Sequence, residues 1–104
     1  MSIQIPTVVL DGFVLSILAE GDSYGYAITQ HVLKYADVSE STLYPVLRRV
    51  KKQGLVTTYD EPTNGRNRRY YRITNEGRTK LDETRQEWIQ FSENVNNLLL
   101  GGKK

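Results

Sequence analysis

The sequence predicts a mainly helical α+β fold, with three short helices, one β-hairpin and one long final helix. Apolar residues recur at spacings of three and four in separate segments of the first half, as on the buried face of a helix. Two β-rich segments then flank a stretch rich in turn-forming residues. The end of the chain carries a longer apolar seam at helical spacing, which predicts one extended helix.

The first two helices follow from apolar faces bounded by helix stops and caps. The first is expected over residues 6–20 and the second over residues 24–35, with Asp22 or Ser23 as the N-cap of the second. Residues 37–38 leave room for a turn or for one very short strand.

The third helix is expected over residues 40–53, between a Ser39 N-cap and a Gly54 stop. At about 100° per residue its side chains separate into two faces. The apolar face holds Leu43, Val46, Leu47 and Val50, and the polar face holds Ser41, Tyr44, Pro45, Arg48 and Lys52. Pro45 removes one backbone hydrogen bond, so we expect a tightened or kinked first turn. A helix with one face to anchor it and one basic, hydroxyl-rich face is suited to contact a ligand.

The hairpin is expected to have strands at residues 55–59 and 69–73, joined by a loop over residues 60–67. Adjacent tyrosines in the second strand point to opposite faces. Tyr71 shares its face with Ile73, so we expect Tyr71 to be the buried one.

The long helix is expected to begin after Thr74 and to end near Gly101. Its seam alternates spacings of three and four, as in a coiled coil. The seam residues are Leu81, Thr84, Trp88, Phe91, Val95 and Leu98. We expect residues 75–104 to form a dimerisation helix attached to a separate domain at residues 1–74.

Charge is concentrated in the middle of the chain. Residues 48–80 contain ten Lys or Arg and three acidic residues, a local charge of +7, whereas residues 1–47 carry −4 and the whole chain only +2. Such a basic patch is typical of a surface that meets a phosphate backbone.

The inventory of side chains argues against other classes of protein. The chain has no Cys and one His, so we expect no metal site, no cofactor and no enzyme activity. The apolar run near the N-terminus is too short to span a bilayer, which needs about 20 residues. We therefore expect no membrane partner and a soluble, cytoplasmic protein.

Three helices followed by a basic hairpin is the layout of a winged helix-turn-helix, in which the third helix enters the major groove of DNA and the hairpin, or wing, lies beside it. A DNA-binding protein is the leading interpretation. A winged-helix module that binds proteins and has lost DNA binding is the alternative, and the arginine cluster in the wing argues against it.

Four segments in this order resemble the PadR family of bacterial transcriptional regulators. They are residues 23–28 (SYGYAI), 41–50 (STLYPVLRRV), 54–56 (GLV) and 65–77 (GRNRRYYRITNEG). The resemblance as a whole covers roughly residues 5–80, and the single final helix is similar to that of the short subfamily.

The resemblance implies a homodimeric repressor that binds a near-palindromic operator of double-stranded DNA. With the charge pattern, it gives twelve expected DNA contacts. These are Tyr24, Ser41, Thr42, Tyr44, Arg48, Arg49, Lys51, Lys52, Gly65, Arg66, Arg68 and Arg69. Asn67 stands where family members often have proline, so we expect a more mobile wing tip. Tyr44 could instead be a packing residue.

Trp88 has two interpretations. It is either an anchor of the dimer interface or, as the resemblance implies, a platform for a flat aromatic effector held between two protomers. In the second case we expect Asp11, Val14, Ala19 and Phe91 to lie near the ligand.

Overall fold

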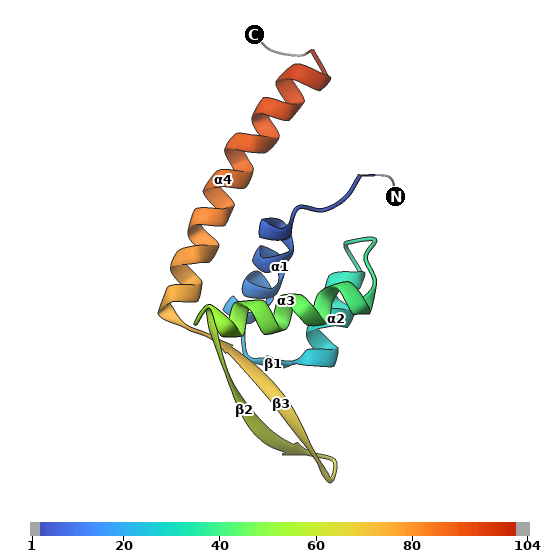
Figure 1. Cartoon of the computed structure of the whole chain (residues 1–104), viewed down its shortest axis with the longest axis vertical. Coiled ribbons are helices and arrows are strands. Elements are labelled where there is room, and N and C mark those ends of the chain that lie inside the picture. Colours follow the sequence, from blue (N-terminus) through green and yellow to red (C-terminus); the bar gives the residue numbers. More distant parts are fainter. Residues whose placement is uncertain (1–2, 102–104) are drawn as a thin grey trace.

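The computed structural model describes residues 3–101, and its elements follow the predicted order with one added strand. The elements are α1 (Thr7–Ala19), β1 (Ser23–Tyr24), α2 (Gly25–Leu33), α3 (Glu40–Lys52), β2 (Val56–Thr63), β3 (Arg66–Ile73) and α4 (Asn75–Leu99). The three short helices pack together, the hairpin projects from one end of them, and α4 leaves in the opposite direction (Figure 1). Four helices with a small antiparallel sheet confirm the predicted fold class.

The added strand lies directly before α2. Ser23 pairs with Tyr71 and Tyr24 pairs with Tyr70, which gives a three-stranded sheet in the order β1-β3-β2. The expected caps of the second helix are therefore wrong, because Ser23 is part of a strand and Tyr24 occupies the N-cap position without a side-chain hydrogen bond. The pairing fixes the start of α2 against the base of the wing.

The hydrophobic core lies between α1, α2 and α3 and extends to the base of the hairpin. All four residues of the predicted apolar face of α3 are buried, and the predicted polar face is exposed. Ser39 caps α3 as expected, because its hydroxyl accepts a hydrogen bond from Thr42 N at 3.2 Å. The helix is continuous through Pro45, and its first turn contains the short-range bond from Thr42 N to Ser39 O.

The wing is a longer and tighter hairpin than the sequence predicted. β2 and β3 pair from Val56↔Ile73 to Thr63↔Arg66, so only Asn64 and Gly65 remain as the turn. Both residues have positive φ, 53° and 78°, which is the geometry of a type I′ turn. The expected eight-residue loop is wrong because β2 is an edge strand, where a proline is tolerated.

Within residues 3–101, the buried residues of α4 all lie in its first half. Thr74 caps it by accepting a hydrogen bond from Gly77 N at 3.0 Å, and the buried residues of the helix are Gly77, Leu81 and Thr84. Gly12 of α1 permits this packing, because a Cβ at position 12 would lie 3.0 Å from the Thr84 methyl group. Leu81 and Thr84, expected in a seam between protomers, thus pack within their own chain.

The second half of α4 extends beyond the helical bundle (Figure 1). Leu98, Leu99 and Leu100 are 86%, 76% and 76% exposed, and Phe91 is 55% exposed. Of the residues that the structure describes, none belongs to a helix long and apolar enough to cross a lipid bilayer.

Candidate nucleic-acid interface

The exposed face of α3 displays the predicted hydroxyl and basic side chains. Ser41, Thr42, Tyr44 and Arg48 are all exposed, while the opposite face of the helix is anchored in the core. The hydroxyls of Ser41 and Thr42 lie 2.8 and 3.0 Å from the Ser39 hydroxyl. The cap therefore organises a small cluster of hydroxyl groups at the start of the helix.

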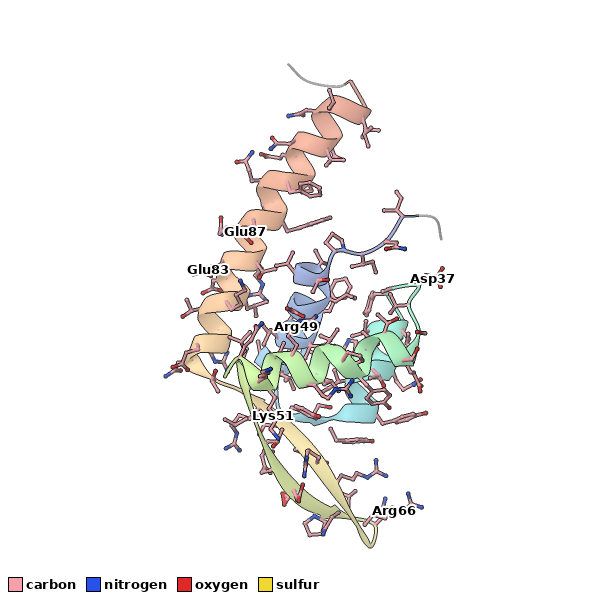
Figure 2. The ribbon with its side chains drawn as sticks, viewed as in Figure 1. Asp37, Arg49, Lys51, Arg66, Glu83 and Glu87 are labelled. Carbon is pink, nitrogen blue, oxygen red and sulfur yellow. The ribbon has the colours of Figure 1, made fainter. Side chains whose placement is uncertain are left out.

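Seven of the predicted contacts are basic, and the structure divides them into two groups. Within residues 3–101, five of the seven make no ion pair with an acidic side chain. These are Arg48, Lys51, Lys52, Arg66 and Arg68. Figure 2 shows Lys51 at the base of the wing and Arg66 at its tip, whereas Glu83 and Glu87 lie on α4, away from the wing. Among residues 3–101, five of the eight basic side chains without an acidic partner thus lie on α3 and the wing, and the other three are Lys34, Arg78 and Lys80.

The other two basic residues are paired. Arg49 lies against α1, where its Nη2 donates to Asp11 Oδ1 at 2.5 Å and its Nε donates to Asp11 Oδ2 at 3.4 Å. Asp11 is buried, so Arg49 joins the two helices and does not share the exposed face of Arg48. Arg69 pairs with Asp60 at 3.5 Å, but both side chains are 58% exposed, and such surface pairs are weak enough to be exchanged for a phosphate.

Tyr71 connects α3 to the wing. It is half-buried and packs against the core, as expected, and burial raises its pKa above 10.0. The charges of Arg69 and Arg48 act in the opposite direction on the same phenol, so these residues of β3 and α3 lie around one tyrosine. The exposed face of α3 and the base of the wing thus lie near each other around Tyr71.

The opposite face of the sheet carries a row of three tyrosines that sequence reasoning missed in part. Tyr24, Tyr70 and Tyr59 come from β1, β3 and β2 and lie side by side, with ring centroids 5.5 and 5.6 Å apart. Asp22 accepts hydrogen bonds at one end of the row, from the Tyr59 hydroxyl at 2.7 Å and from Arg72 Nε at 3.0 Å. This carboxylate raises the pKa of Tyr59 above 10.0. The correct hairpin register would have paired Tyr59 with Tyr70, but Tyr24 joins the row through β1, a strand that the sequence analysis did not predict.

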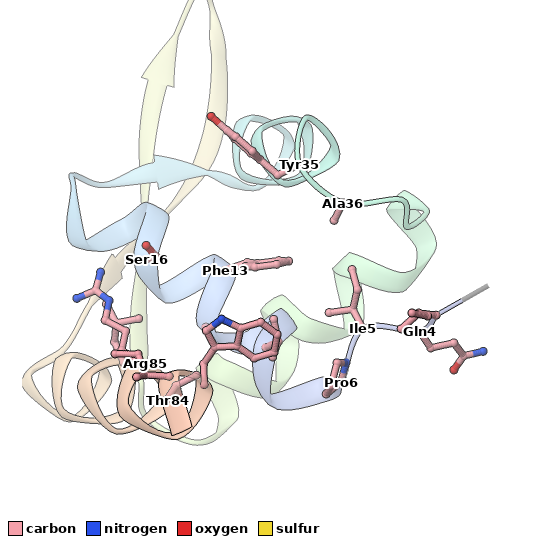
Figure 3. A pocket seen from close by; sticks show the side chains of 15 residues that line it. Gln4, Ile5, Pro6, Phe13, Ser16, Tyr35, Ala36, Thr84 and Arg85 are labelled. Carbon is pink, nitrogen blue, oxygen red and sulfur yellow. The ribbon is translucent and has the colours of Figure 1, made fainter. Parts of the chain in front are cut away.

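An apolar hollow of about 650 Å³ lies between α1, the first half of α4 and the segment after α2. Figure 3 shows Phe13 facing into it, with Ile5 and Ala36 at its edge and Arg85 near Ser16. Trp88 also lines the hollow, is 47% exposed and lies 6.0 Å from the Phe91 ring.

None of the four residues expected beside an effector, Asp11, Val14, Ala19 and Phe91, lines this hollow. Val14 is 1% exposed and belongs to the core, and Asp11 is held by Arg49. The N-terminal segment and the segment after α2 supply much of the wall instead, including Ile5 and Tyr35. Their contribution depends on tertiary packing, which the spacing within one helix does not reveal.

His31 lies beside Tyr35, with the ring centroids 5.8 Å apart. Among residues 3–101, no cluster of three or more His, Asp or Glu side chains is arranged to hold a metal ion.

The three short helices, the short strand β1 before α2 and the basic hairpin define a winged helix-turn-helix protein with a long C-terminal helix. The sequence model of the transcriptional regulator PadR-like family matches residues 14–83. This chain belongs to the PadR-like family. It is a family of transcriptional regulators, which confirms both the resemblance and the expectation that the protein is not an enzyme.

Individual relatives agree with this assignment. A transcriptional regulator of Mycobacterium tuberculosis is 34% identical over 91 residues, which cover 86% of this chain and 81% of that protein. The solved structure of smu.1704 from Streptococcus mutans has a TM-score of 0.89 at 32% identity and covers 100% of this chain and 98% of that one. The structure of Bacillus subtilis PadR in complex with operator DNA has a TM-score of 0.66 at 24% identity, over 75% of this chain and 47% of that one, and so shares the fold.

Proposed function

We propose that the protein is a homodimeric repressor that binds a near-palindromic DNA operator through α3 and the wing. The observation that carries the proposal is the group of five basic side chains without acidic partners on these two elements. Arg48 and the hydroxyls of α3 would meet base edges or phosphates in the major groove, and Lys51, Lys52 and the wing would hold the backbone. A module that binds only proteins does not account for this charge.

The second half of α4 supports a dimer formed by two copies of this chain. The helix has 25 residues and is about 37 Å long, yet its buried residues all lie in the first ten positions. Exposed Phe91 and Leu98, with half-buried Val95 between them, continue the predicted seam. A two-fold dimer would present two recognition helices about 34 Å apart, one turn of the duplex.

The apolar hollow supports an effector site for a flat aromatic compound. Its volume lies within the range of small-molecule pockets, about 300–1,000 Å³. Since Trp88 is the single tryptophan, its fluorescence reports on the site directly. Titration with the planar aromatic cation ethidium, without DNA present, should quench this fluorescence in a saturable way. Unchanged fluorescence throughout the titration would contradict an aromatic site at Trp88.

The DNA proposal is tested by fluorescence anisotropy on two labelled duplexes, the DNA directly upstream of the protein's own gene and a scrambled duplex. Binding should weaken steeply with salt, because each neutralised phosphate releases counterions. Substituting Arg48 or Arg66 by Ala removes one phosphate contact per protomer, hence two contacts in a dimer. The negative slope of log affinity against log salt should therefore become shallower by about two in each variant. Lys34→Ala, at the far end of α2 from Tyr24, is the matched control and should leave the slope unchanged.

Preference for the upstream duplex would identify an autoregulatory operator. Equal, salt-sensitive binding to both duplexes would place the operator elsewhere. The proposal is wrong if the protein binds neither duplex at low salt.

A further inference from the structure

The two arginines at the ends of the tyrosine row (Tyr24, Tyr70 and Tyr59) are held in different ways. Arg72 lies over the Tyr59 ring, with its Cζ 4.8 Å from the centroid, and its Nε donates to Asp22. Its charge is therefore balanced within the protein. Arg68 lies over the Tyr24 ring at 4.5 Å, and within residues 3–101 it makes no ion pair.

The Arg68 guanidinium is further constrained on one edge. Its Nε is buried and has no hydrogen-bond partner in the described part of the chain. Stacking on an aromatic ring is a position that a planar guanidinium favours, and it removes much of the rotational freedom of a long side chain. The two terminal amino groups remain available for bonds to oxygen atoms of a ligand.

Tyr24 is fixed in turn by the sheet. It pairs with Tyr70 across β1 and β3, its ring meets the Tyr70 ring edge-on, and Tyr70 stacks on Tyr59. Each of the three strands thus contributes one tyrosine ring, and the row joins the start of α2 to the wing. The ring face of Tyr24 is occupied by Arg68.

We infer that Tyr24 is a positioning residue, whose ring holds the Arg68 guanidinium ready for a DNA phosphate, and that Arg68 makes the contact. The inference rests on the proposed function and changes the expected role of Tyr24 from direct contact to platform. A hairpin that lies along a groove has a phosphate strand on each side. Arg68 and Arg69 lie on opposite faces of β3, so they can serve one strand each.

The test separates the ring of Tyr24 from its hydroxyl. Anisotropy is measured over a salt series on a duplex of about 30 base pairs, long enough for two half-sites. Tyr24→Phe keeps the ring and should bind within about twofold of the unchanged protein. Tyr24→Leu removes the ring and should weaken binding about fivefold per protomer, the size of an exposed cation–π contact. Arg68→Ala should weaken binding at least as much and lower the salt slope.

Non-additivity is the decisive readout. If Tyr24 acts only through Arg68, the double variant Tyr24→Leu with Arg68→Ala should bind no more weakly than Arg68→Ala alone. Arg68→Lys leaves Tyr24 and the core untouched, so it tests the same idea in a chain that folds normally. Lysine keeps the charge but cannot stack as a plane, so this variant should bind several-fold more weakly. Arg72→Ala, whose charge Asp22 already balances, is the matched control and should leave the salt slope unchanged.

Three results would overturn the inference. A loss with Tyr24→Phe equal to that with Tyr24→Leu would show that the hydroxyl touches DNA, and fully additive losses in the double variant would show independent roles. Full affinity in Arg68→Lys would show that stacking is not needed. Failure of the unchanged protein to bind DNA at low salt would remove the proposed function itself, which is a different outcome from these three.

Discussion

Gly77 is the position where a single added carbon should disturb this fold most. The residue lies in the first turn of α4, directly over the backbone that joins α3 to β2. A Cβ at this position would lie 2.1 Å from Leu55 O and 2.7 Å from the Ile73 Cγ1 atom. Leu55 O already accepts a hydrogen bond from Thr74 N at 3.0 Å, so it cannot move without weakening that bond.

The size of the effect follows from two opposing contributions. Forcing extra atoms into a packed interior costs about 1–3 kcal/mol, and the upper end applies here because the obstacle is backbone and not a flexible side chain. Alanine in place of glycine within a helix returns up to about 1 kcal/mol. We expect Gly77→Ala to lower the free energy of unfolding by about 2 kcal/mol, which corresponds to about 8–16 °C in Tm for a domain of this size.

Urea unfolding followed by circular dichroism, at one fixed protein concentration, measures the change. Gly25→Ala is the matched control, because a Cβ there would meet only ordinary contacts at 3.6 and 3.9 Å. That variant should stay within about 0.5 kcal/mol of the unchanged protein. Equal stability of both variants would refute the argument that α4 needs a bare backbone at its first turn.

Three further predictions concern the dimer, the phenol of Tyr71 and the α1–α3 ion pair. Leu98→Glu should move the protein toward monomers in sedimentation velocity, since burying each Leu98 side chain in a dimer interface is worth about 1.5–3 kcal/mol. Asn97→Glu adds the same charge at a neighbouring polar position, so this control variant should remain dimeric. The free energy of unfolding should fall as pH rises above 10.0, because the unfolded chain releases the Tyr71 proton while the folded chain, with its raised pKa, still retains it. Urea unfolding at pH values on both sides of 10.0 measures this slope, and the slope should be smaller in Tyr71→Phe; an identical slope would assign the effect to other groups. Asp11→Asn should lower the free energy of unfolding by about 1–2 kcal/mol, because it leaves Arg49 half-buried without its carboxylate, and unaltered urea unfolding would mean that water satisfies the guanidinium.

Local periodicity was sufficient to predict α3 and its two faces, because the spacing of apolar and polar residues along an amphipathic helix shows which side is buried. It was insufficient for Arg49, which differs from Arg48 only in facing Asp11, a residue 38 positions earlier in the chain. No pattern within one helix identifies the partner that a distant helix will supply.

The wing shows a second limit. Asp60 and Pro62 are turn-forming by composition, yet both belong to β2, since the edge of the sheet leaves their polar groups in water. The Asn64-Gly65 pair alone made the turn, and giving it priority over composition would have yielded the correct strand lengths and the pairing of Tyr59 with Tyr70. Thr84 was placed in the dimer seam by its spacing, and only the glycine at position 12 explains why it is buried against α1.

The continuous pairing of the hairpin also bears on the kinetics of DNA binding. Asn67 pairs with Pro62 in the ladder, so the paired strands include the position where family members often have proline. Ordering a flexible segment costs about 1–2 kcal/mol per residue, and a preformed hairpin avoids this cost for six of the eight residues once expected in a loop. A wing that is ordered before the encounter can dock as a rigid patch. Differences in affinity between operators should then appear mainly in how long the complex lasts and only slightly in how fast it forms.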